Sequence, residues 1–178
     1  MSCASTIPTN LEIAYHPKVE GVLRAIAKGE KLTHVDLSDC RLTAIPEAIF
    51  QLKDSLISLN LGGNQLSSLP DGMAELQCLR ILFFAQNKFK TVPVVLGKLS
   101  KLYMLSFKSN EISHIDDKSL SPSICWLILT DNKISEIPSS IGKLTGLLKL
   151  MLAGNELSSL PDEMQQCRVI YDTLDSPF

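Results

Sequence analysis

The sequence predicts an α/β solenoid, a curved stack of similar coils with a parallel sheet on its concave side and short helices or 3-10 turns on its convex side. Two observations lead to this fold class. Leucine fills 29 of the 178 positions while aromatic residues make up only 6%, so the core must be built from one aliphatic residue in a regular arrangement. The motif L-x-x-L-x-L-x-x-N-x-L, clear at residues 56–66, occurs in six copies at steps of 22 to 24 residues, as expected for a repeat architecture.

The most regular residue of the motif is its asparagine. Its slot falls at positions 40, 64, 87, 110, 132 and 155, and five of the chain's seven asparagines occupy it. Cys40 fills the first slot, where a small thiol still fits a buried site. Because an asparagine amide both donates and accepts hydrogen bonds, we expect stacked asparagines to satisfy backbone groups of adjacent coils.

Each repeat divides into a strand and a return segment. The apolar alternation within L-x-x-L-x-L has period two, which predicts a short strand with one face toward the core. An apolar residue and proline then follow in five repeats, and proline ends the extended segment because it lacks an N–H and fixes φ. Apolar residues spaced three apart after the proline fit a short helical or 3-10 return. One repeat alone cannot bury its leucines, so the core forms only when neighbours stack.

The fourth repeat departs from this pattern. It has Ile115-Asp116 where the others have an apolar residue and proline, it is one residue short, and its return at 116–123 is polar. We therefore expect a local irregularity on the convex side at this repeat.

The chain divides into an N-terminal helical cap at 1–31, six repeats at 32–163, and a degenerate C-terminal repeat or cap at 164–178. A solenoid exposes its core at both ends unless they are covered. An amphipathic helix is predicted from Pro17 to Lys31, with Gly29 as its stop. Its apolar face consists of Val19, Val22, Leu23 and Ile26. At the other end, a seventh strand is expected to begin near Ile170.

The motif is that of leucine-rich repeat proteins, whose fold is a curved horseshoe, and the resemblance covers the chain from about Leu32 to Pro161. The return, with its L-P-x-x-I-x-x-L-x-x-L pattern, resembles the intracellular class found in Ras-pathway scaffolds, Scribble-like polarity scaffolds and plant Ras-group repeat proteins. The resemblance implies a non-catalytic protein–protein interaction module, a scaffold or adaptor. Two alternatives remain open: a regulatory subunit of a signalling enzyme, such as a phosphatase or small-GTPase pathway component, and a ligand-sensing fragment of a larger receptor or effector.

Composition excludes several other classes of protein. A formal net charge of −2 leaves a nucleic-acid binder without its basic footprint, and no apolar run is long enough to span a membrane. The start of the chain lacks the features of a signal peptide. The five cysteines are widely spaced, as expected for reduced thiols rather than a disulfide framework or a zinc site. We expect a cytoplasmic or nuclear protein without a cofactor, either a monomer or a weak homodimer.

Signals for catalysis are weak. The three histidines are dispersed and no phosphate-binding or nucleophile motif is present. Gly62-Gly63 favours a tight backbone turn rather than a phosphate loop. His34 and Asp36 share the predicted concave face and are within reach of a hydrogen bond, but no nucleophile lies near them in the motif. We expect the chain not to be an enzyme.

The outward positions of the strands form rows across the predicted sheet, because parallel strands lie about 4.8 Å apart. These rows are polar in the first two repeats and apolar in the next four. The apolar set, called here the concave strip, consists of Ile81, Phe83, Met104, Trp126, Ile128 and Met151. Lys108 and Lys149 stand beside it and are expected to pair with acidic groups of a partner. An apolar patch rimmed by charge is typical of a protein-binding surface with aromatic anchors; the alternatives are that these side chains only pack on one another or that two copies associate through them.

Overall fold

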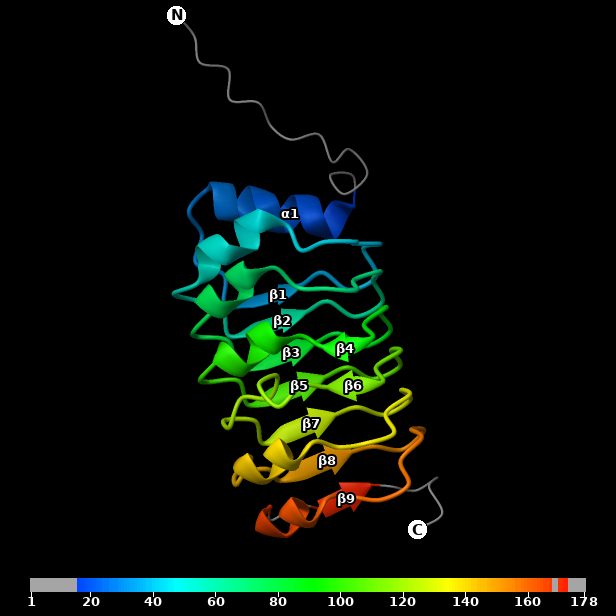
Figure 1. The fold of residues 1–178 in the computed structure, drawn as a ribbon. Coiled ribbons are helices and arrows are strands. Elements are labelled where there is room, and N and C mark those ends of the chain that lie inside the picture. Colours follow the sequence, from blue (N-terminus) through cyan, green and yellow to red (C-terminus); the bar gives the residue numbers. More distant parts are fainter. Residues whose placement is uncertain (1–15, 168–169, 173–178) are drawn as a thin grey trace, which may run out of the picture.

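The computed structural model describes residues 16–167 and 170–172, which form the solenoid predicted from the sequence (Figure 1). Within this part of the chain, seven parallel strands make one continuous sheet in the order β1-β2-β3-β5-β7-β8-β9. They are β1 (His34–Asp36), β2 (Ser58–Asn60), β3 (Ile81–Phe83), β5 (Met104–Ser106), β7 (Trp126–Ile128), β8 (Lys149–Met151) and β9 (Ile170–Asp172). The repeat-to-repeat order of the strands confirms the predicted fold class.

The strands are aligned so that equivalent residues of successive repeats are neighbours. The central residue of each of the first six strands of this sheet faces the core, and these residues are Val35, Leu59, Leu82, Leu105, Leu127 and Leu150. All five leucines of this row are fully buried. Phe84, Phe89 and Phe107 occupy leucine slots inside the core, where their ring centroids lie 5.0–5.1 Å apart. The core is thus one column that every repeat extends by the same amount.

Short 3-10 helices form the five returns that begin with proline. They are η2 (Glu47–Leu52), η3 (Asp71–Glu75), η4 (Val94–Lys98), η5 (Ser139–Lys143) and η6 (Asp162–Gln166), and each is preceded by proline at its N-cap. Proline holds the extended φ of the cap while its missing N–H leaves no donor unsatisfied. The helices lie to the side of the strands in Figure 1, as the return pattern predicts.

The fourth return has turns and bends in place of a helix between Ile115 and Trp126, which confirms the predicted irregularity. The hydroxyl of Ser119, fully buried, donates to the carbonyl of Val92 at 2.8 Å. A Cβ at Gly97 in η4 would collide with the carbonyl of Lys118. The fourth return therefore packs its backbone directly against η4.

A second, two-stranded sheet joins the third and fourth repeats. It pairs β4 (Thr91–Val92) with β6 (His114–Ile115) in parallel. The repeat pattern does not predict this pairing, because it depends on two neighbouring returns being extended at the same point.

An asparagine ladder connects the coils, as expected from the repeated slot. Asn110 donates from Nδ2 to the carbonyls of Phe84 in the preceding repeat at 2.8 Å and Phe107 in its own at 3.0 Å, and its Oδ1 accepts the N–H of Phe89 at 3.1 Å. The same type of bonding to two repeats recurs at Asn64, Asn87, Asn132 and Asn155. Each asparagine thus satisfies backbone groups that neighbouring coils would otherwise leave buried and unpaired.

The turn after each strand is left-handed in all six repeats. Its residues are Asp39, Gly63, Gln86, Ser109, Asp131 and Gly154, with φ between 54° and 69°. The tight turn expected at Gly62-Gly63 is therefore confirmed at Gly63, and the same turn is made elsewhere by residues other than glycine.

Helix α1 (Pro17–Ala27) lies across the first coil at the N-terminal end of the stack (Figure 1). The helix is shorter than predicted, because Lys28 is its C-cap and Gly29 turns left-handed with a φ of 77°. Val19 and Ile26 are buried against the core, while Val22 and Leu23 are partly buried. No helix in the described part of the chain is long and apolar enough to cross a membrane.

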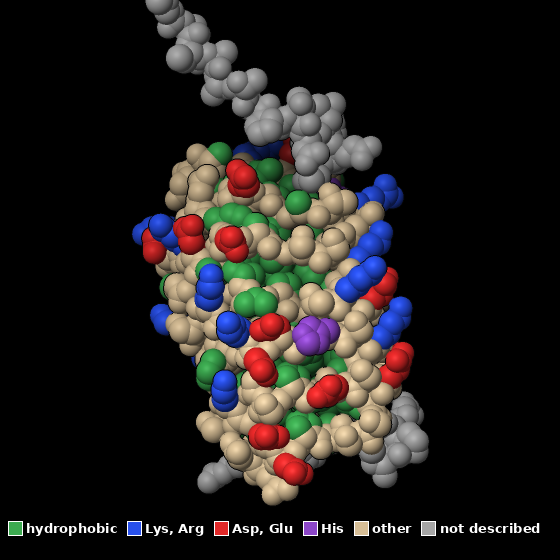
Figure 2. Space-filling model, viewed as in Figure 1, with side chains coloured by type: hydrophobic (Ala, Val, Ile, Leu, Met, Phe, Trp, Pro, Cys, Tyr) green, Lys and Arg blue, Asp and Glu red, His purple; other side chains and the backbone are tan. Residues whose placement is uncertain are grey.

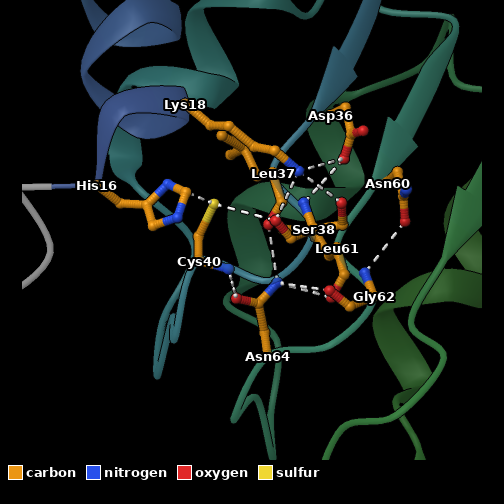
Figure 3. A network of polar contacts seen from close by, with 10 residues as sticks. All are labelled: His16, Lys18, Asp36, Leu37, Ser38, Cys40, Asn60, Leu61, Gly62 and Asn64. Atoms are coloured by element: carbon orange, nitrogen blue, oxygen red, sulfur yellow. Dashed lines mark hydrogen bonds and ion pairs between the residues drawn. The ribbon is translucent and has the colours of Figure 1, made fainter.

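Polar contacts tie α1 to the first repeat (Figure 3). The ammonium of Lys18 donates to the carbonyl and hydroxyl of Ser38 at 3.0 and 2.9 Å. The thiol of Cys40 lies 3.2 Å from Nδ1 of His16, and its backbone N–H donates to Oδ1 of Asn64 at 3.1 Å. The cysteine in the first asparagine slot is buried, as predicted, and it contacts the helix side instead of an earlier repeat.

Candidate functional site

The structure brings the residues of the concave strip together on one face of the main sheet. One row of neighbours across β3, β5, β7 and β8 is Ile81, Met104, Trp126 and Lys149, and the other row is Phe83, Ser106, Ile128 and Met151. Lys108 follows two residues after the end of β5. All eight residues predicted for partner binding therefore lie on four adjacent repeats.

The side chains of the concave strip are half-buried. Their flanks pack against equivalent side chains on strands about 4.8 Å away, so packing on one another accounts for part of their burial. The rest of each side chain is open to solvent, and Lys108 beside them is exposed. The strip thus combines packing within the sheet with an accessible apolar surface.

Trp126 and Lys149 form the best-defined contact of this surface. The two residues are direct neighbours on β7 and β8, and the ammonium of Lys149 lies 5.4 Å from the centroid of the Trp126 ring. A cation over an aromatic face is attracted by the negative charge density of the ring. The contact holds a positive charge next to the largest apolar side chain of the strip.

Ser106 differs from its row. The alternation predicts an outward position, yet its side chain is only 5% exposed because its neighbours in register are the much larger Phe83 and Ile128. Its hydroxyl accepts the N–H of Lys108 at 3.4 Å. The small residue therefore lets the flanking apolar side chains cover the middle of the strip.

Three further apolar residues adjoin the strip and were missed by the sequence reasoning. Tyr103, Cys125 and Leu148 each precede a strand, and the inter-strand bonds continue through them: Tyr103 accepts the N–H of Cys125 at 2.9 Å, and Cys125 accepts that of Leu148 at 2.8 Å. Leu148 is 51% exposed. The signal in the sequence was the second position of the motif, which is apolar or aromatic in these same repeats.

The concave face of the first repeat is polar and internally bonded. Asp36 accepts the N–H of Ser38 at 2.8 Å, and hydrogen bonds from the side chain and backbone of Ser38 lower the pKa of Asp36. Lys18 lies 3.9 Å from the same carboxylate. His34 has Thr33 as its neighbour, with Nδ1 and the hydroxyl 3.0 Å apart. His34 and Asp36 therefore do not bond to each other as the sequence allowed, and each has a different partner.

The described residues contain no group of three His, Cys, Asp or Glu side chains able to hold a metal ion. The described cysteines are free thiols: Cys40 and Cys167 are buried, and Cys78 and Cys125 are half-buried.

Away from the strip, the fourth return borders a cavity of about 400 Å³ lined by residues 113–118 together with Ser135, Glu136 and Pro138. The face seen in Figure 2 carries charged side chains of both signs, with Asp and Glu gathered around a histidine.

Comparison with known proteins agrees with this architecture. A family model described as leucine rich repeat matches residues 30–89. The adenylate cyclase of Podospora anserina is 31% identical over 94 residues, which are 52% of this chain and 4% of that protein. The chain therefore spans a very small part of this curated relative.

Two solved structures show the same arrangement of coils. The leucine-rich repeat domain of the type III effector XCV3220 (XopL) has a TM-score of 0.73 at 21% identity and covers 90% of this chain and 62% of that one. The plant peptide hormone receptor RGFR1, solved in complex with RGF2, has a TM-score of 0.64 at 31% identity and covers 73% of this chain and 22% of that one. The chain has the leucine-rich repeat fold.

Proposed function

We propose that this chain is a protein-binding module, a scaffold or adaptor, whose concave strip takes a protein partner. The observation that carries the proposal is the strip itself: six apolar side chains on four adjacent strands, with the chain's only tryptophan among them and lysines beside them. Trp126, Phe83 and Ile128 are the anchors, because large apolar side chains near the centre of a patch dominate binding energy. Met104, Ile81 and Met151 are adaptable neighbours.

The fold supports a binding role. Leucine-rich repeat domains generally mediate protein–protein interaction, and the structural neighbour RGFR1 was solved with RGF2 bound. Free thiols at the described cysteines fit a reducing compartment, and we place the chain in the cytoplasm or nucleus, in line with the intracellular class that its returns resemble.

A second candidate is a regulatory subunit of a signalling enzyme. The similarity to an adenylate cyclase favours it, since in that protein the matching repeats occur in a chain named for its enzymatic activity. Under this alternative the strip binds the catalytic domain of an enzyme and changes its catalytic rate. If an enzyme is recovered as the partner, adding the purified chain is expected to alter its turnover.

Removing the anchors tests the main proposal. The double variant Trp126→Ala and Phe83→Ala is expected to reduce recovery of a cross-linked partner by about tenfold or more. Val94→Ala is the matched control, because Val94 is an exposed apolar residue on η4 away from the strip. Circular dichroism and thermal unfolding check the fold of each variant. Unchanged partner recovery by a folded double variant would show the proposal to be wrong, and loss of its fold would favour packing as the role of these side chains.

A further inference from the structure

We propose that the partner of the concave strip is a protein segment with apolar side chains between two carboxylates. This inference rests on the proposed function and adds the chemistry of the partner. The segment lies across the fourth to sixth repeats, with one carboxylate at Lys149 and the other at Lys108.

The concave face of the third to sixth repeats carries more positive than negative side chains. Three cations, Arg80, Lys108 and Lys149, flank the strip, and the exposed residues beside the ladder asparagines add Lys88 and Lys133 against the carboxylates of Glu111, Asp131 and Glu156, which leaves an excess of cations. Asp131 already accepts the hydroxyl of Ser109 at 3.3 Å. Within residues 16–167 and 170–172 the ion pair that forms is Lys18 with Asp36, so the three cations keep their charge available for a partner. Carboxylates complement this surface and cations are repelled by it.

The contact between Trp126 and Lys149 determines which side chains the partner can place at one end of its segment. The ammonium lies over the ring at 5.4 Å from its centroid, so the tryptophan orients the lysine before any partner arrives. An incoming segment gains from both residues at once when it sets an apolar side chain beside the ring and a carboxylate on the ammonium. A basic side chain in the same place would compete with Lys149 for the ring and meet its charge.

The register of the sheet sets the spacing of the two carboxylates. Lys149 is aligned with Trp126 and Met104 across β8, β7 and β5, and Lys108 follows Met104 by four residues. Two strand spacings of about 4.8 Å and four residues of about 3.3 Å place the two lysines roughly 16 Å apart. An extended segment covers that distance in about five residues, which leaves room for apolar side chains on the strip between its acidic ends.

The polar first repeats mark where the segment ends. Beyond β3 the same rows continue with Ser58 and Asn60, and then with His34 and Asp36. The carboxylate of Asp36 is exposed and would repel an acidic segment. The apolar and cationic part of the concave face is therefore limited to the last four repeats.

Selection from random peptides tests this chemistry even while the partner is unidentified. Phage-displayed peptides of about twelve residues are selected on the wild-type chain, with the Trp126→Ala variant used to remove peptides that bind elsewhere. The expected pool is rich in peptides with two Asp or Glu about five residues apart and Leu, Ile or Phe between them. Selection on the Lys108→Glu and Lys149→Glu double variant is expected to lose these acidic positions.

Fluorescence anisotropy on one selected peptide then measures the charge effect. Replacing its acidic residues with lysine is expected to weaken binding to the wild-type chain by about tenfold or more, and the Lys108→Glu and Lys149→Glu variant should weaken the acidic peptide to the same degree. Lys98→Glu with Lys143→Glu is the matched control, because it changes the net charge equally on η4 and η5. Binding of the acidic peptide should also fall as salt is raised.

The outcomes separate this inference from the proposed function. A pool of neutral or basic peptides that still requires Trp126 would overturn the acidic partner and leave the concave strip as a binding site. A pool that depletion on the Trp126→Ala variant removes entirely, or no enrichment, would overturn both. Sedimentation that shows a dimer lost on Trp126→Ala would assign the strip to a second copy of the chain and overturn the separate partner.

Discussion

At the scale of single residues, each asparagine of the ladder serves backbone groups that no strand or helix reaches. The polypeptide turns sharply after every strand, so carbonyls such as those of Phe84 and Phe107 point into the core without a partner in the sheet. One amide side chain satisfies both and also accepts a backbone N–H. Removing that amide leaves the buried N–H of Phe89 unpaired, which costs on the order of 1–3 kcal/mol, while the carbonyls of Phe84 and Phe107 keep the amides of Asn87 and Asn132 as donors.

We therefore expect Asn110→Ala to lower the free energy of unfolding by about 2 kcal/mol. Asn60→Ala is the control, because Asn60 lies half-buried on the concave face and accepts only the N–H of Gly62 at 3.1 Å. Its loss should be about 1 kcal/mol or less. Urea unfolding monitored by circular dichroism measures both variants, and equal losses would contradict a special role of the ladder.

Thiol reactivity gives a second prediction at this scale. Burial raises the pKa of Cys40 and of Cys167 above the ordinary value of 9.0, so both hold their protons more tightly when folded. The stability that this contributes is fully present below the unfolded pKa and is lost as pH rises through the folded pKa. In the native chain we expect iodoacetamide to modify both at least about tenfold more slowly than Cys78 and Cys125.

Mass spectrometry of the digested chain follows each cysteine separately. In concentrated urea the four rates should converge, because burial no longer separates the thiols. Native rates that do not differ would show that Cys40 and Cys167 are more accessible than their burial indicates.

The sequence predicts the inward residues better than the outward ones. An inward slot needs one size and one polarity, so leucine and asparagine identify it directly. The burial of Ser106 was not predictable from alternation, since it results from large neighbours on two other strands. The positions of Tyr103, Cys125 and Leu148 beside the strip were not predicted for a related reason. The hydrogen bonds between neighbouring repeats begin at these residues, one position before the alternating pattern that identifies each strand.

At the scale of elements, proline decides which returns form helices. It precedes every 3-10 helix in the described chain, and the one return that begins with Asp116 instead folds into turns that pack on η4. These consequences follow from local chemistry and were predictable. The pairing of β4 with β6 was not, because it requires both the extended segment after Phe89 and the irregular return after Ile112 to lie in register.

The close packing of the fourth return makes Gly97 a sensitive position. Gly97→Ala is expected to destabilise the chain by about 2 kcal/mol, because the new methyl group meets the carbonyl of Lys118 and rigid backbone cannot yield. The same substitution at Gly21, where no atom lies within 4 Å, should stabilise α1 by about 0.5–1 kcal/mol. Thermal unfolding measures the two shifts, and a neutral Gly97→Ala would mean that this return moves freely.

At the scale of the whole molecule, every coil contacts only its neighbours, so stability is a sum of repeat and interface contributions. Helix α1 lies on one end of this linear arrangement, and its Val19 is fully buried against the first coil. Damage to an end is therefore expected to spread inward by repeats rather than unfold the chain at once.

Val19→Asp should test this behaviour, since it places a charge in an apolar contact without a partner. Backbone amides of the first two repeats are expected to exchange with solvent at least about tenfold faster, while those of the fifth and sixth repeats keep their protection. Val94→Asp, at an exposed valine, is the control for the substitution itself. Uniformly faster exchange along the chain would contradict the inward spread and indicate a single cooperative unit.

The asparagine ladder also gives the solenoid a direction. Every ladder amide bonds backward, to a carbonyl and an N–H of the repeat that precedes it. The first repeat has Cys40 in this slot, and helix α1 rather than a repeat lies before it. A unit added before the first coil would thus find the thiol of Cys40 where its backbone requires an amide. Growth of such an array at its N-terminal end, by duplication or by design, is therefore disfavoured as long as a cysteine fills this slot.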